Sequence, residues 1–245
     1  MVEKKKKTNV LQVIMTLLLI VAAFAIGSMW TELRMLRGGV RQNPTVKEAV
    51  PGEENVPEEV TELSETQRQE LLTGAAAARG SDDARVVLVE FTDYQCPFCK
   101  RHFDQTEAQI EEEYIETGKV KHVMRDLPLP FHENAYLAAE AARCAGDQER
   151  YLDYHDKLFE MQAIWGEGEA NSLFKGYAGE LGLNQGEFAS CLDEGKHKEA
   201  VDDDLVLAAK VGATGTPSFF INGKSLIGAQ PFISFKDMID EALGE

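Results

Sequence analysis

The feature that most constrains the fold of this chain is a pair of cysteines separated by two residues, Cys96-Pro97-Phe98-Cys99. The run before it, Arg85–Phe91, has a continuous apolar centre, which is typical of a strand covered on both faces. The run after it, Lys100–Tyr114, has the length and composition of a helix. A helix start carries unpaired N–H groups and a partial positive charge, which favour a thiolate over a thiol. Because the thiolate attacks disulfides, this placement predicts a redox-active pair.

The rest of the domain predicts a mixed α/β sheet interrupted by helices. A second strand at 119–126 follows the first helix, and a strand–helix–strand order implies a parallel pair. A helical insertion is expected at about 132–212, with helices at 134–145, 148–161, 171–181, 185–194 and 198–211. Asn222-Gly223 then separates two short β-favouring runs, 218–221 and 224–228, which predicts a hairpin. A helix at 234–243 closes the chain.

The N-terminus predicts export. Residues 4–7 are lysines, and an uncharged, mostly apolar run extends from Thr8 to Thr31. About 20 such residues cross a bilayer as a helix, so we expect a signal-anchor at 10–30 with a cytoplasmic tail at 1–9. The alternative is a signal peptide cleaved near Ala25, which leaves a secreted or periplasmic protein. Both place the domain in an oxidising compartment, where disulfides persist.

Residues 31–79 are acidic, punctuated by prolines and free of aromatic side chains, which predicts a flexible stalk before a domain at 80–245. A short helix at 60–72 is compatible with the spacing of its leucines. The formal net charge of −17 makes nucleic acid an unlikely ligand class. Because the chain offers no evident dimerisation segment, we expect a monomer.

Three stretches together resemble the DsbA-like thiol-disulfide oxidoreductases, which have a thioredoxin fold with a helical insertion. They are residues 89–99, Ala141-Ala142-Arg143-Cys144-Ala145 and 215–223, within a resemblance covering about 75–245. The resemblance implies that Cys96 is the attacking thiolate and that Cys99 resolves the mixed disulfide, without a cofactor. The alternatives at this pair are a passive disulfide and half of a metal site, and the chain has no second Cys-x-x-Cys to complete four zinc ligands.

The resemblance also implies a substrate-binding surface around the cysteines. Thr216-Pro217 matches the family's cis-proline loop, which offers backbone groups to an extended substrate peptide. The alternative is a trans proline that begins a strand. Pro97 and Phe98, between the cysteines, are expected to contribute to the same surface.

Glu90 matches an acidic residue that relays protons to the second cysteine in the family. At the end of an apolar strand its carboxylate should be desolvated, with a raised pKa. The alternative is an exposed edge residue. We expect His102 on a solvated helix surface, with a role as general base as the alternative. His132 and Asn134 are expected to cap the next helix.

Cys144 and Cys191 lie on apolar faces of the insertion, and relatives with cysteines at these places bridge them in a structural disulfide. Two buried free thiols are the alternative, and a second redox relay is another. Asp202-Asp203-Asp204 lacks the alternating ligands and glycine of a calcium loop, and predicts a solvated helix face.

The sequence therefore predicts a membrane-anchored enzyme that donates the Cys96–Cys99 disulfide to exported cysteine-containing proteins. A quinone-linked membrane partner would reoxidise it. The same site used as a reductase or isomerase is an alternative, and a redox-inert holdase or metal-binding module is another. Strong oxidants of the family have histidine where this chain has Phe98, so a milder oxidant is expected.

Overall fold

A computed structural model of the chain describes residues 62–245. The predicted cytoplasmic tail at 1–9, the membrane anchor at 10–30 and most of the predicted stalk lie outside the described residues. Within 62–245, no helix combines the length and apolar composition that crossing a bilayer requires.

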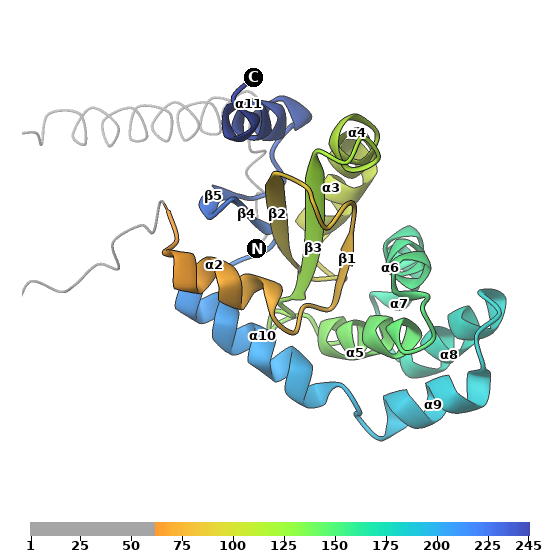
Figure 1. Cartoon of the computed structure of the whole chain (residues 1–245). Helices are drawn as coiled ribbons and strands as arrows, with labels where there is room; N and C mark the ends of the chain where they lie inside the picture. The colour runs from red at the N-terminus through yellow and green to blue at the C-terminus, as the bar shows by residue number, and fades with distance from the viewer. Residues whose placement is uncertain (1–61) are drawn as a thin grey trace, which may run out of the picture. The chain divides into compact units, whose positions relative to one another are not determined.

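The described chain forms one five-stranded sheet in the order β1-β3-β2-β4-β5 (Figure 1). The central strand β2 (Val86–Thr92) pairs in parallel with β3 (Val120–Asp126). All the other pairs are antiparallel, and they add β1 (Ala77–Arg79), β4 (Ser218–Ile221) and β5 (Lys224–Ile227). The predicted mixed sheet, with a βαβ half and a hairpin half, is therefore confirmed.

The alternation of side chains along β2 divides the core between the two faces of the sheet. Val86 and Leu88 pack on one face, in a cluster with residues of α4 (Ala108–Ile110) and α11 (Phe232–Leu243). Phe91 packs on the other face, in a cluster with residues of α2 (Glu65–Leu72) and α10 (Lys198–Val211). Both faces of β2 are thus covered, as its continuous apolar centre predicts.

The helix that follows the cysteine pair runs without a break from Pro97 to Ile115, close to its predicted extent. It is divided into α3 (Pro97–His102), a π-helical segment η1 (Phe103–Glu107), α4 and a second π-helical segment η2 (Glu111–Ile115). The wider π turns are absent from the prediction because apolar periodicity alone does not distinguish them from α-helical turns.

Most of the helical insertion between β3 and β4 gathers beside β1 and β3, and its last helix, α10, runs back alongside α2 (Figure 1). Five of its helices match the predicted ranges within a few residues, and only the short α7 is unpredicted. The five matching helices are α5 (Ala135–Gly146), α6 (Tyr151–Glu160), α8 (Asn171–Glu180), α9 (Gln185–Asp193) and α10. The helix α7 (Gln162–Trp165) lies between α6 and α8. Large buried rings, including Phe159, Trp165, Phe174 and Phe188, form its core.

The domain begins before residue 80, so the prediction of a flexible stalk through 79 is wrong for residues 62–79. The short helix expected there is present as α2, which begins at a Ser64–Gln67 capping box. Leu63 and Leu71 are 3% and 1% exposed and join the core beside Val89. β1 then pairs with β3. Two leucines and a short strand therefore attach the end of the acidic segment to the sheet.

The predicted hairpin is confirmed. Asn222 and Gly223 connect β4 and β5 with φ angles of 46° and 91°. Positive φ at both positions is what a two-residue hairpin turn requires, and asparagine and glycine tolerate it best.

Candidate active site

The Cys96-Pro97-Phe98-Cys99 segment lies where the central strand passes into the following helix, as predicted. Cys96 occupies the N-cap of α3, and Pro97 fills the first helical turn, where its missing N–H costs no hydrogen bond. The Cys96 N–H donates to Asp93 O at 3.0 Å, and its carbonyl accepts the first helical hydrogen bond from Lys100 at 3.1 Å. Both sides of the cysteine are therefore fixed by the backbone.

Both active-site cysteines are free thiols within the described part of the chain, and both are covered. Cys96 is 3% exposed and Cys99 is 1% exposed. The Cys96 thiol donates to Thr216 O at 3.5 Å, and Cys99 Sγ accepts the Asp93 N–H at 3.4 Å. The helix start therefore does not leave Cys96 open to solvent in this conformation, because the Thr216 loop lies over its sulfur.

The two thiols differ strongly in acidity. The Cys99 thiol, which donates to the Cys96 sulfur, is the largest influence on Cys96 and lowers its pKa to about 6, against the effect of burial. Thr216 and the backbone N–H groups of Cys99 and Phe98 lower it further. Burial raises the pKa of Cys99 well above its usual value, and the neighbouring Cys96 raises it further. The pair therefore holds one thiolate, on Cys96, at neutral pH.

The predicted proline loop lies against this thiolate. The Thr216–Pro217 peptide is cis, as expected, and β4 follows it and pairs with β2. The Ser218 hydroxyl donates to Gly215 O at 2.6 Å and closes the loop on itself. The Thr216 side chain also lies beside this sulfur, and its hydroxyl is buried. Sequence segments 120 residues apart therefore meet at one sulfur, as the resemblance implies.

The aromatic and proline side chains between the cysteines face outward. Pro97 is exposed, and Phe98 is 53% exposed with the Arg101 guanidinium 5.1 Å from its ring centroid. An exposed ring beside the attacking sulfur is available for contact with a polypeptide.

Glu90 is buried, not at an exposed edge, and it is 2% exposed. Its carboxylate lies 3.1 Å from His122 Nε2 on β3 and 4.0 Å from His102 Nε2 on α3. Burial alone would raise the pKa of Glu90, but the His122 hydrogen bond and the charges of His102 and His122 lower it to about 2. The predicted raised pKa is therefore wrong, because the sequence pattern does not place these imidazoles around the carboxylate.

The prediction that His102 lies on a solvated helix surface is also wrong. It is 1% exposed, and its ring packs against Phe219 and Phe235, with centroids 4.5 and 5.2 Å away. Burial lowers its pKa. Its neighbours on the helix suggested solvent, but the α3 face that contains it packs between the sheet and α11.

The turn before Cys96 is held by polar residues that the sequence did not single out. Asp93 is buried and accepts hydrogen bonds from Leu129 N at 2.8 Å and His132 Nδ1 at 2.7 Å. Gln162, at the start of α7, donates to the carbonyls of Tyr94 and Cys96 at 2.7 and 3.2 Å. The insertion thus contributes directly to the shape of the active-site turn.

His132 and Asn134 do not cap α5 through their side chains. Asn134 is the N-cap by position but forms no side-chain capping bond, and its amide donates to the carbonyls of Trp165 and Gly168 at 3.1 and 2.9 Å. His132 bonds Asp93 instead. Both residues therefore hold loops of the active-site region together.

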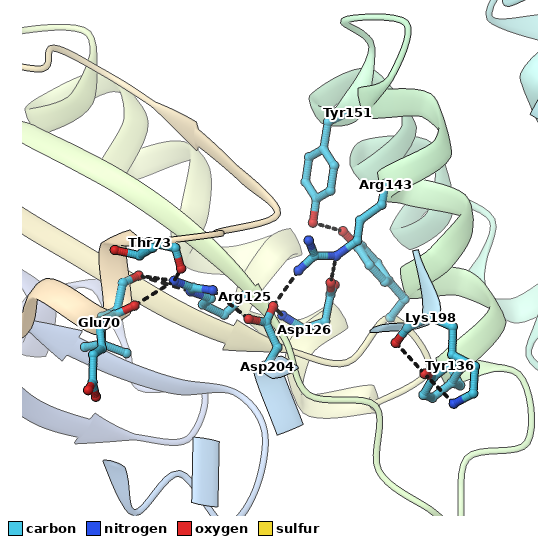
Figure 2. A network of polar contacts seen from close by, with 11 residues as sticks. Glu70, Thr73, Arg125, Asp126, Tyr136, Arg143, Tyr151, Lys198 and Asp204 are labelled. Atoms are coloured by element: carbon cyan, nitrogen blue, oxygen red, sulfur yellow. Dashed lines mark hydrogen bonds and ion pairs between the residues drawn. The ribbon is translucent and has the colours of Figure 1, made fainter. Parts of the chain in front are cut away.

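A buried ion network anchors the insertion to the sheet (Figure 2). Asp204 on α10 accepts from Arg125 on β3 and from Arg143 on α5, each at 2.6 Å, and from Asp126 N at 2.9 Å. Arg143 also donates to Asp126 at 2.5 Å. Asp204 is 1% exposed, so the predicted solvated face for 202–204 is wrong at this residue. Burial raises the pKa of Asp126 to about 6.

The residues of this network also contact the end of α2 and a tyrosine that bonds the active-site turn. Arg125 donates to Leu71 O at 2.8 Å and to Thr73 O, so it caps the carbonyl end of α2. Figure 2 shows Tyr151 beside Arg143, and the Tyr151 hydroxyl lies 2.9 Å from that of Tyr94, two residues before Cys96. Polar contacts of Arg125, Arg143 and Asp204 thus connect α2, β3, α5 and α10.

The predicted structural disulfide is present. Cys144 on α5 and Cys191 on α9 are bonded, with their Cα atoms 5.9 Å apart. The two cysteine pairs therefore have different states, one bonded and one reduced.

Comparisons with known proteins agree with this geometry. A family model described as Thioredoxin matches residues 73–241. Disulfide bond formation protein D of Bacillus subtilis is 30% identical over 172 residues, which cover 67% of this chain and 75% of that protein. The crystal structure of oxidised BdbD from Bacillus subtilis superposes with a TM-score of 0.65 at 27% identity, covering 71% of this chain and 95% of that one.

A Na(+)/H(+) antiporter, NhaA 1 of Salinispora arenicola, is 35% identical over 147 residues. This match covers 60% of the present chain but only 21% of the antiporter's length. The similarity thus concerns one part of that protein.

Proposed function

The chain belongs to the Thioredoxin family, among thiol-disulfide oxidoreductases of the DsbA type, and from this premise we propose that it oxidises exported proteins. It would donate the Cys96–Cys99 disulfide to cysteine pairs of its substrates. The observation that carries this direction is the contrast between the two thiols, with the pKa of Cys96 lowered to about 6 and that of Cys99 raised. A stabilised thiolate favours the reduced form of the pair, and a pair that prefers to be reduced oxidises others.

The transfer takes two exchange steps. A substrate thiolate attacks Cys96 Sγ of the disulfide; an S–S bond forms to the substrate, and Cys99 leaves with the electron pair. The high pKa of Cys99 means that it takes up a proton at once. A second substrate thiolate then attacks the substrate sulfur of the mixed disulfide, and Cys96 leaves as a thiolate. Because a thiol of low pKa is the better leaving group, the acidity of Cys96 accelerates release of the oxidised substrate.

Substrate binding would use the surface around Cys96. The residues that we assign to it are Thr216, Pro217, Pro97 and Phe98. The Thr216 carbonyl, 3.5 Å from Cys96 Sγ, would accept a backbone N–H from an extended substrate segment next to the reacting sulfur. The half-exposed Phe98 ring would contact an apolar side chain of the same segment.

Glu90 would act on Cys99 through the negative charge of its carboxylate and not as a nucleophile. Its carboxylate is one of the groups that raise the pKa of Cys99. Paired with His122, it would keep Cys99 protonated after each turnover and lower the tendency of the reduced pair to attack substrate disulfides through that sulfur.

The cellular setting completes the hypothesis. We propose a single-pass membrane protein with a cytoplasmic N-terminus and an extracytoplasmic domain, or a secreted form cleaved near Ala25. A quinone-linked membrane protein would reoxidise the dithiol, and the enzyme would act as a monomer. A bridged Cys144–Cys191 pair supports an oxidising compartment.

One observation favours a reductase or isomerase as the second candidate. A nucleophile pKa of about 6 lies nearer to about 7, the value of thioredoxin, than to about 3.5, the value of DsbA. Linear interpolation between their potentials, about −270 and −120 mV, gives about −230 mV for this pair.

Equilibration of the full chain with glutathione buffers, read by thiol trapping and mass spectrometry, tests the direction. A potential clearly above about −230 mV supports the oxidase, whereas a lower one, toward the about −270 mV of thioredoxin, assigns the site to reduction. Cys96→Ala is the control for a redox-inert holdase or metal-binding module: full activity of this variant in the cell would end the enzyme hypothesis.

A further inference from the structure

The second cysteine pair lies in a cluster of metal-ligand types. In the described residues, Cys144 Sγ, Cys191 Sγ and a ring nitrogen of His197 all lie within 4.8 Å of one another. Asp147, the C-cap residue of α5, adds an oxygen: Asp147 Oδ2 lies 2.9 Å from His197 Nε2 and 3.5 Å from Cys191 Sγ. Two sulfurs, one imidazole and one carboxylate therefore converge.

Local structure holds these donors in place. Cys144 and Asp147 are three residues apart at the end of α5, so they share one face of that helix. After α9, Gly195 has a φ of 62° and the Lys196 N–H donates to Cys191 O at 3.0 Å, which turns the chain back on itself. This turn returns His197, at the N-cap of α10, to the sulfur of Cys191.

The distances approach those of a tetrahedral zinc site. With Zn–S of about 2.3 Å and Zn–N or Zn–O of about 2.0 to 2.1 Å, the edges of the tetrahedron measure roughly 3.3 to 3.8 Å. The Asp147–His197 and Asp147–Cys191 separations, 2.9 and 3.5 Å, are already near these edges. The two sulfurs are closer than a tetrahedral edge because they are bonded to each other, so reduction has to separate them before a metal ion can enter.

The cluster is accessible from solvent. Cys144, Asp147 and Cys191 line a cavity of about 360 Å³, and Asp147 and His197 also line a neighbouring one of about 670 Å³. The Lys196 ammonium, 2.9 Å from Asp147 Oδ2, occupies the place of a cation beside this carboxylate. Lys196 has 58% of its side chain exposed, so it can withdraw into water when a metal ion binds.

We propose that Cys144, Cys191, His197 and Asp147 form a zinc site when the Cys144–Cys191 disulfide is reduced. A dithiol reductant supplies two electrons and two protons, becomes a disulfide itself, and leaves two thiols on the chain. Zn²⁺ then replaces the two thiol protons, which are released to solvent, and takes Nε2 of neutral His197 and one oxygen of Asp147 as its other ligands. The disulfide and the metal are mutually exclusive cross-links.

The consequence is a cross-link between α5 and α9 that survives reduction. In the oxidised chain the S–S bond joins these helices, and in the reduced chain the metal would join the same two residues. Because the metal binds the folded arrangement and not the separated thiols, its binding energy adds to the stability of the reduced fold.

The test uses the full chain with Cys96→Ser and Cys99→Ser, so that the active-site thiols cannot bind zinc. This protein is reduced with a phosphine, incubated with Zn²⁺, freed of excess metal and analysed for zinc, with the oxidised protein treated in parallel. We expect about one zinc ion per reduced chain and none per oxidised chain. Co²⁺ in place of Zn²⁺ should give thiolate-to-metal absorption and the visible bands of a tetrahedral complex.

Three further variants assign the ligands. His197→Ala and Asp147→Ala, both at partly exposed positions, should each weaken zinc affinity by at least about tenfold. Ser190→Ala, in the same cavity wall, is the matched control and should leave the affinity unchanged. Equal zinc affinity in all three variants would overturn the four-ligand site. So would a reduced chain that keeps its near-ultraviolet circular dichroism but retains no zinc, or one that unfolds and is not restored by zinc.

Discussion

The low pKa of Cys96 should depend on a hydrogen bond from Cys99, and two substitutions at Cys99 separate this cause from the others. Cys99→Ala removes the donor, whereas Cys99→Ser keeps an O–H in nearly the same place. Both leave Cys96 as the one free thiol, because the remaining cysteines of the four are bonded to each other. The pair of variants therefore isolates the side-chain donor from the backbone N–H groups of α3.

The expected size follows from the energy of a hydrogen bond to a charged group. Such a bond contributes about 1.5 to 3 kcal/mol, which corresponds to about one to two pKa units. The pKa of Cys96 should therefore rise from about 6 to between about 7 and 8 in Cys99→Ala, and much less in Cys99→Ser. At pH 6 the thiolate fraction would fall from about one half to between about one tenth and one hundredth.

The rate of attack on a small disulfide gives a second signature. Nucleophilicity rises with thiol pKa with a Brønsted coefficient of about 0.4 to 0.5, so the lost thiolate is partly offset. Cys99→Ala should react about two to six times more slowly than Cys99→Ser at pH 6, but about three to eight times faster above pH 9, where both are ionised.

The assay is a pH titration of thiolate absorbance in the ultraviolet, followed by stopped-flow kinetics with an aromatic disulfide. If both variants titrate near 6 and their rate profiles coincide, the Cys99 donor is not the cause. The backbone N–H groups at the start of α3 and the Thr216 side chain would then account for the low pKa of Cys96.

Three further predictions concern the potential and the stability of the domain. Phe98→His should raise the reduction potential by about 30 mV per unit by which it lowers the pKa of Cys96, whereas Phe98→Leu, which also adds no cation, should not; glutathione equilibration measures both. Asp204→Ala removes the carboxylate that two buried guanidinium groups share and leaves Arg125 without its acidic partner. It should therefore cost about 3 to 5 kcal/mol and lower Tm by about 6 to 20 °C in thermal unfolding. A loss of less than about 1 kcal/mol, as expected for exposed Asp203→Ala, would contradict the network. Because the pKa of Glu90 is lowered to about 2 from about 4.3 unfolded, its contribution of about 3 kcal/mol should be complete above pH ~4.3 and decline as the pH falls toward 2. Urea unfolding between about pH 2 and 5 should show this slope in the natural chain and lose it in Glu90→Gln.

Local signals in the sequence were sufficient for the elements and for the reacting sulfurs. A strand, a Cys-Pro-x-Cys turn and a helix identify the position of Cys96 because each feature acts within a few residues. Asn222-Gly223 similarly identifies its hairpin because both residues tolerate positive φ. The resemblance then joined Thr216-Pro217 to the cysteines, a contact that spans 120 residues and that no local rule supplies.

The failures concern charges whose partners are distant in sequence. Glu90 was assigned a raised pKa because burial was visible in its strand, but His122 lies 32 residues away and meets it only through the pairing of β2 with β3. Asp204 appeared to belong to a solvated acidic run, but it is buried between Arg125 and Arg143. A sequence pattern alone therefore does not show whether a charged residue is buried, because its burial depends on a partner of opposite charge that is distant in the sequence.

The same reasoning changes the significance of Phe98. From the motif alone, the absence of a histidine between the cysteines implied a poorly stabilised thiolate. In the structure the thiolate is stabilised by groups that do not depend on which residue stands at position 98. These groups are the Cys99 thiol, the first N–H groups of α3 and Thr216. These give a pKa of about 6, so a phenylalanine at this place removes one contribution and leaves the others intact. At pH 7, a thiol of pKa about 6 instead of about 8.5 stabilises the reduced pair by about 1.4 kcal/mol, or about 30 mV. The potential of this enzyme therefore depends first on helix start and loop geometry, and the residue between the cysteines adjusts it.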